Sequence, residues 1–119
     1  NAVDKRELDG LKIEMIDRFG LLPEAEKLLF EVTLLKLYAE SLGIQKIETN
    51  VRFGKVIFTN DTVVDPYSIV KLVQDNSRVY SLSGATELKF RHDLDDARDR
   101  IDFVKQLLDT LTPESLKVA

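Results

Sequence analysis

The sequence predicts an α+β domain in which helices cover a small antiparallel sheet, with the element order ααββαββα. Apolar residues recur at the helical spacing of three and four up to about residue 42, and from residue 44 they follow the strand period of two. Gly43 marks this change, since glycine favours the left-handed position just past a helix. Another helical pattern, over residues 94–111, follows two further strand-like segments.

The first helix is expected over residues 4–19, with Gly20 ending it. One side of this helix is apolar and faces the core. A second stripe, turned away from the apolar side at about 100° per residue, is mostly acidic. Its members are Glu7, Gly10, Glu14 and Asp17, with Ile13 beside them.

The second helix is expected over residues 23–42. Pro23 suits the first helical position, because its missing N–H would have no partner there. Glu24 and Glu26 favour the positive end of the helix dipole. Apolar residues occupy most sides of this helix, which predicts a central helix covered by several elements.

The remaining elements follow from β-forming residues and turn signals. Asp65 is expected to cap a short helix in which Pro66 takes the first position. We expect strands at 44–49, 55–59, 79–82 and 86–90, a loop at 50–54, a hairpin turn at 83–85, and a last helix at 94–111.

Composition excludes several classes of protein. The 119 residues fit one domain, and the net charge of −4 argues against a dedicated nucleic-acid module. The absence of cysteine excludes disulfides and thiol catalysis. No apolar run approaches the ~20 residues that a membrane span needs, so a cytosolic location and no membrane partner are expected.

Catalytic and metal-binding patterns are weak. His92 is the only histidine, and it is expected at the surface of a strand-to-helix junction. The glycines are isolated, so no phosphate-binding loop is present and no cofactor is expected. An acidic run could hold a magnesium or calcium ion, but helix capping explains it better. Its members are Asp93, Asp95, Asp96 and Asp99.

One segment favours an alternative function. Residues 51–55 combine Arg52, Phe53 and Lys55, and basic and aromatic side chains together are typical of surfaces that contact nucleic acids. This alternative is a small nucleic-acid-binding module that uses these three residues with Arg91. Two positive charges in this segment are a weak signal, and a polar hairpin loop is the simpler interpretation.

The segment EMIDRFG at residues 14–20 resembles the signature of the C-terminal domain of bacterial transcription-repair coupling factors, the Mfd-type DNA translocases. The resemblance continues through LGIQKIE at 42–48 and LSGATELKFRHDL at 82–94, and covers roughly residues 8–111. It departs from the family mainly at residues 50–54, for which it supports no function.

The resemblance implies a regulatory domain without catalytic activity. In this family the domain follows an ATP-dependent motor, which uses ATP and Mg²⁺ to displace stalled RNA polymerase. The domain docks on a UvrB-like N-terminal domain of the same chain and masks the surface that binds UvrA. The resemblance assigns this docking contact to Glu14 and Asp17, and Glu7, Gly10 and Ile13 are weaker candidates.

These observations lead to one main hypothesis and two alternatives. The chain is expected to be a single regulatory domain, 1–119, of a larger translocase in nucleotide excision repair, with no direct contact to nucleic acid. Residues 1–7 are expected to be a linker remnant, and 112–119 a loose tail. The alternatives are the nucleic-acid module at 51–55 and a small enzyme built around His92, and no nucleophile motif supports the enzyme.

Overall fold

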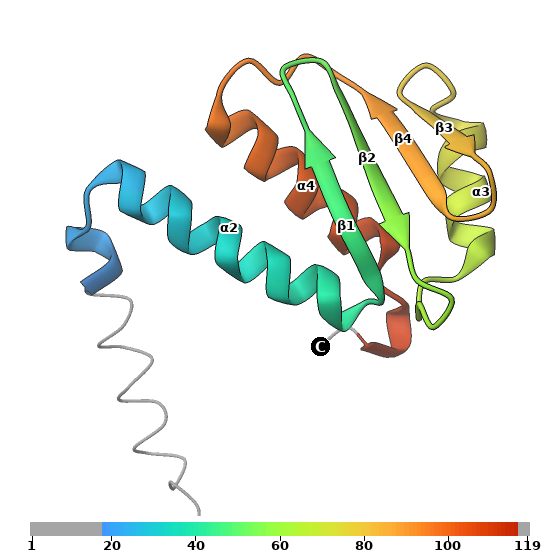
Figure 1. Cartoon of the computed structure of the whole chain (residues 1–119), viewed down its shortest axis with the longest axis horizontal. Helices are drawn as coiled ribbons and strands as arrows, with labels where there is room; N and C mark the ends of the chain where they lie inside the picture. Colours follow the sequence, from blue (N-terminus) through green and yellow to red (C-terminus); the bar gives the residue numbers. More distant parts are fainter. Residues whose placement is uncertain (1–17, 117–119) are drawn as a thin grey trace, which may run out of the picture.

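A computed structural model describes residues 18–116. Residues 18–21 are helical and precede α2 (Glu24–Ser41), β1 (Ile44–Thr49) and β2 (Phe53–Phe58). The order continues with α3 (Pro66–Asp75), β3 (Tyr80–Ser83), β4 (Glu87–Arg91), α4 (Ala97–Leu111) and a short 3-10 helix, η1 (Glu114–Leu116). The predicted α+β class and element order are confirmed over this range (Figure 1).

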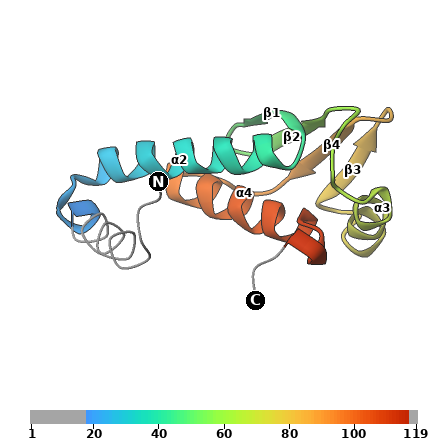
Figure 2. The same cartoon turned by 90° about the horizontal axis from the view of Figure 1, so that it is seen from below.

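The four strands form one antiparallel sheet in the order β1-β2-β4-β3. Helices α2 and α4 lie side by side on one face of the sheet, and α3 lies beside β3 (Figure 2). The first turns of α2 project beyond the sheet in both views. Among residues 18–116, no helix covers the other face of the sheet, which we call the open face (Figure 2).

The core lies between the sheet and the helices. Alternate residues of β2 and β4 point into it, as the strand period of two requires. The helix α4 contributes an apolar side at helical spacing. The largest fully buried side chains are those of Val56, Leu88, Phe90, Leu94, Leu108 and Leu111.

Two glycines are required by their surroundings. Gly43 has a φ of 77°, in the left-handed region that glycine favours, which confirms the predicted cap after α2. Gly54 lies opposite Phe90 in the sheet. A Cβ atom at position 54 would lie 2.1 Å from Cζ of Phe90, so only glycine lets this ring enter the core.

Several predicted boundaries are corrected by the structure. The helix before α2 includes Gly20 and ends at Leu21, so Gly20 does not stop it. Pro23 precedes α2 with an extended ψ of 154° and is not its first helical residue. Strand β2 begins at Phe53, which shortens the predicted 50–54 loop, because Asn50 accepts backbone hydrogen bonds at its side-chain oxygen and closes a tighter turn.

The C-terminal part also differs in detail. Strands β3 and β4 each begin one residue later than expected, and α4 begins at Ala97 because the side chain of Asp96 caps it. Thr112, expected in a loose tail, is buried, and its hydroxyl donates a hydrogen bond to the carbonyl oxygen of Leu108. Residues 117–119 lie outside the described range.

Candidate docking surface

The residues that the sequence assigns to docking lie outside the described range. Glu7, Gly10, Ile13, Glu14 and Asp17 all precede residue 18, so the structure does not place them. The motif that contains Glu14 and Asp17 enters the described part of the chain at Arg18 and Phe19.

The motif ends against the beginning of α2. The ring centroids of Phe19 and Phe30 are 5.4 Å apart, and the ammonium group of Lys27 lies 5.8 Å from the centroid of the Phe19 ring. Both distances are typical of favourable ring and cation–π contacts. The end of the motif is thereby attached to the projecting part of α2.

The helix α2 carries a line of exposed apolar side chains, Phe30, Leu34 and Leu37, which we call the α2 stripe. These residues recur at i, i+4 and i+7, so they share one side of the helix. Their exposed fractions are 38%, 51% and 57%. Of the residues in α2, only Ala39 is buried, so the prediction of a central helix covered on most sides is wrong for the described residues.

Two polar contacts fix α2 on α4 and so determine which side of α2 faces outward. Arg98 donates two hydrogen bonds to the carboxylate of Glu31. The hydroxyl of Tyr38 contacts the hydroxyl of Thr112 and donates to Oδ1 of Asp109 at 3.2 Å. These contacts lie on the side of α2 that faces α4, and the residues of the α2 stripe, beside that side on the helix surface, stay exposed.

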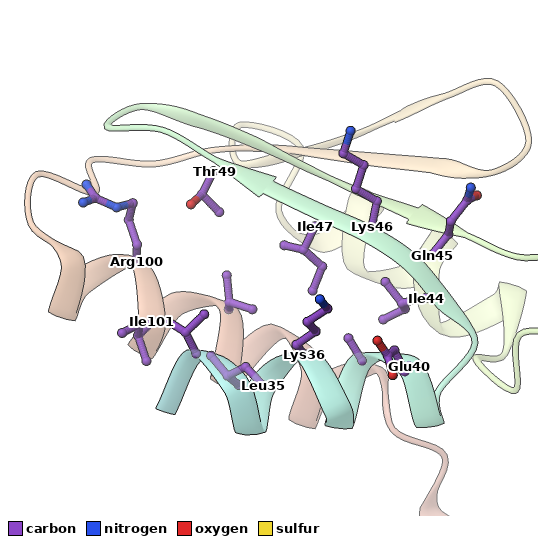
Figure 3. Close-up of a pocket in the computed structure, with 13 residues that line it drawn as sticks. Leu35, Lys36, Glu40, Ile44, Gln45, Lys46, Ile47, Thr49, Arg100 and Ile101 are labelled. Carbon is purple, nitrogen blue, oxygen red and sulfur yellow. The ribbon is translucent and has the colours of Figure 1, made fainter. Parts of the chain in front are cut away.

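A cleft of about 340 Å³ lies between α2, β1 and α4 (Figure 3). Ile44 and Ile47 enter it from β1, and the side chain of Lys46 points away from it. Lys36 and Arg100 contribute polar groups at the rim. The lining is mainly apolar, which suits an apolar side chain of a partner better than catalytic chemistry.

The structure brings together part of the predicted basic and aromatic segment. Phe53 pairs with Arg91 across β2 and β4, and the guanidinium carbon of Arg91 lies 5.4 Å from the centroid of the Phe53 ring. Lys55 pairs with Lys89 two residues further along. The sequence analysis missed Lys89, which the strand alternation of β4 would place on the same face as Arg91.

The candidate enzymatic residues have structural contacts. The ring of His92 packs against Phe103 at a centroid distance of 5.1 Å, and its Nδ1 atom lies 3.1 Å from the carbonyl oxygen of Asp93. Its exposed position at the junction after β4 is the predicted one. In the acidic run, Asp96 caps α4 by accepting from the N–H of Asp99.

The described residues contain neither a metal-binding cluster nor a membrane-spanning helix. Over residues 18–116, no group of three or more histidine, cysteine, aspartate or glutamate side chains is arranged to hold a metal ion. Within the same range, no helix has the length and apolar character needed to cross a membrane.

Comparison with known proteins gives consistent matches. Residues 1–69 match the family described as the TRCF domain. The chain is 41% identical over 110 residues to a transcription-repair-coupling factor of Haemophilus influenzae, covering 92% of the chain. It is 36% identical over 116 residues to the factor of the same name from Escherichia coli, covering 98% of the chain. In both cases the aligned region is 10% of the relative, so the chain spans about a tenth of the length of these proteins.

Proposed function

The chain belongs to the TRCF domain family of the transcription-repair coupling factors, and from this premise we propose that it is a regulatory docking domain. It docks on a UvrB-like N-terminal domain of its own parent chain and masks the surface that binds UvrA. This docking restrains the ATP-dependent translocase that removes stalled RNA polymerase. ATP and Mg²⁺ belong to that motor, and this domain has no catalytic role of its own.

The observation that carries the proposal is the α2 stripe. Isolated exposed apolar residues are ordinary, but a row of them along one side of a helix marks an interaction surface. The stripe consists of Phe30, Leu34 and Leu37. Elsewhere on the same helix, Leu29 and Val32 expose further apolar surface. Because this chain is about a tenth of its relatives' length, the rest of such a protein would supply a surface to cover it.

The acidic pair, Glu14 and Asp17, adds charged contacts to the apolar stripe. Glu14 and Asp17 are three residues apart, so in a helix they lie on one side and can meet two arginines together. Charged contacts of this kind set orientation and specificity more than affinity. Phe19, two residues after Asp17, contacts Phe30 of the α2 stripe. We therefore assign affinity to the stripe and orientation to the acidic pair.

The proposal is tested by reversing the charge of the acidic pair in the full-length parent protein. Glu14→Arg combined with Asp17→Arg is expected to release the domain and to increase UvrA binding, measured by titration of purified UvrA. The matched control reverses Asp61 and Asp75, which are exposed and lie after β2 and at the end of α3. This control changes the net charge equally and is expected to leave UvrA binding at the wild-type level.

The role of the α2 stripe is tested separately. Leu34→Glu with Leu37→Glu is expected to weaken docking of this chain on the purified UvrB-like domain by at least tenfold, since charged groups would have to be buried in the interface. Circular dichroism provides the control, because both residues are exposed and their replacement should leave the fold intact. If neither the stripe variant nor the charge reversal alters docking or UvrA binding, the proposed function is wrong.

A further inference from the structure

We infer that the open face of the sheet binds single-stranded nucleic acid, through a surface formed by Phe53, Lys55, Lys89 and Arg91 that we call the cationic sheet patch. This inference goes beyond the proposed docking function and rests on different residues. It revises the expectation that the chain makes no direct contact to nucleic acid: the net charge is −4, but positive side chains gather locally on this face.

The strand register places the four side chains in a compact block. Phe53 is opposite Arg91, and Lys55 is opposite Lys89, on the two central strands of the sheet. Residues two apart in a strand point to the same face, so all four share one face. Phe90, between Lys89 and Arg91, is buried on the helix side, which fixes the patch on the open side.

The charges of this face do not balance. Lys55 lies 3.8 Å from one carboxylate, Glu48, and 3.7 Å from another, Glu87. Glu48 also forms a 2.6 Å ion pair with Lys46, which lowers the pKa of Glu48 chiefly through the hydrogen bond between them. Within residues 18–116, neither Lys89 nor Arg91 has a carboxylate at ion-pair distance. The patch therefore has an excess of positive charge.

Two facing lysines are unfavourable without a counter-ion, because like charges directly opposite in a sheet destabilise it. Glu48 and Glu87 lie within 4 Å of Lys55, and among the described residues no carboxylate lies that close to Lys89. An anionic ligand would remove this cost. Phosphate groups that release their counter-ions on contact with lysine and arginine are the general source of nucleic-acid affinity.

The aromatic ring indicates which anionic polymer fits best. The Phe53 side chain is 50% exposed, and the guanidinium group of Arg91 lies over the Phe53 ring. A hollow of about 850 Å³ has Phe53, Lys55 and Lys89 in its lining, together with Glu48, and Arg91 lies outside that lining. Unpaired bases stack on such rings and on arginine, whereas the faces of bases in a duplex are already covered. An acidic peptide would use the lysines but would gain nothing from the ring.

Direct binding measurements with the 119-residue chain test the inference. The probes are fluorescein-labelled oligothymidylate and oligouridylate of about 15 nucleotides, a typical length for such sites. Fluorescence anisotropy is expected to give a dissociation constant on the order of 10⁻⁴ M at physiological salt, typical of non-specific binding, and tighter binding at low salt, for both probes. Equal affinity is expected because the patch contacts phosphates and bases and has no assigned contact to the sugar.

The variants separate the two parts of the patch. Phe53→Ala is expected to reduce affinity about tenfold, as removal of one stacking partner generally does. Lys89→Glu with Arg91→Glu is expected to abolish binding. Lys89→Ala with Arg91→Ala should make the affinity less dependent on salt. The slope of log association constant against log[salt] is expected to become less negative by about 1.4, since each lost phosphate contact contributes about 0.7. Lys71→Glu with Arg78→Glu, which makes the same charge change on α3 and the turn after it, is expected to bind as wild type.

An oligoglutamate of equal length separates nucleic acid from an acidic peptide. If the oligoglutamate binds as tightly as oligothymidylate and Phe53→Ala weakens neither, the patch is a surface for acidic peptides and the inference is wrong. Absence of oligonucleotide binding at low salt also overturns it. Neither result bears on whether the docking proposal is correct, because that proposal is tested by variants at other positions, namely Glu14, Asp17, Leu34 and Leu37.

Discussion

The guanidinium group of Arg98 in α4 donates two hydrogen bonds to the carboxylate of Glu31 in α2, at 3.0 and 2.6 Å. The two residues are 67 positions apart in the chain. Glu24 and Asp102 lie 4.0 and 3.6 Å from the same guanidinium group. Two parallel hydrogen bonds fix orientation as well as distance, so this pair helps to determine which side of α2 faces outward.

This pair predicts a pH dependence of stability. The hydrogen bond from Arg98 is the main cause that lowers the pKa of Glu31 below the ordinary value of 4.5. The stabilisation is therefore fully present above about pH 4.5, and it is lost as the pH falls through the lowered pKa. Glu31→Gln is expected to remove this part of the acid dependence, measured by urea unfolding between about pH 6 and 2. Glu26→Gln, an exposed change in the same helix, should retain it.

The buried and exposed leucines should differ strongly in their contribution to stability. Leu108 is 0% exposed in the core, and Leu37 of the α2 stripe is 57% exposed. Leu108→Ala is expected to lower the free energy of unfolding by about 2–5 kcal/mol, because it leaves a cavity. Leu37→Ala should change it by less than about 0.5 kcal/mol. Equal losses in denaturant titrations would show that α2 is covered and that the α2 stripe is not a free surface.

Gly54 and Phe90 are expected to be energetically coupled. Gly54→Ala would place Cβ 2.1 Å from Cζ of Phe90 and 2.7 Å from the backbone oxygen of Glu48. Overpacking of this kind is expected to cost about 1–3 kcal/mol. Phe90→Leu removes the ring, so the double variant should lose less than the sum of the single losses, measured by a double-mutant cycle. If the two losses of unfolding free energy simply add, the cost of Gly54→Ala comes from the backbone oxygen of Glu48 alone and not from Phe90.

The cap of α3 provides a local test. The Oδ1 atom of Asp65 accepts a 2.9 Å hydrogen bond from the N–H of Tyr67, and Pro66 occupies the first turn. Asp65→Ala is expected to lower the free energy of unfolding by about 1 kcal/mol. Asp65→Asn keeps the acceptor and should be close to wild type in thermal unfolding. A loss as large for asparagine as for alanine would contradict the capping role.

The sequence by itself determined the features that depend on neighbouring residues. The element order, the cap at Asp65 and the left-handed Gly43 all follow from periodicity, capping chemistry and backbone sterics within a few residues. The family signature of the segment at 14–20 is also local.

Only the tertiary structure decided the surfaces on which the proposals rest. The sequence predicted α2 as a covered helix, because apolar residues on all sides do not show which side lacks a partner. The Arg98–Glu31 pair joins residues distant in the chain and attaches α2 to α4, and the α2 stripe stays exposed in this arrangement. The strand order β1-β2-β4-β3 likewise brings Lys89 and Arg91 beside Lys55 and Phe53. Strand pairing between distant segments depends on the packing of the whole chain, and local residue patterns do not encode it.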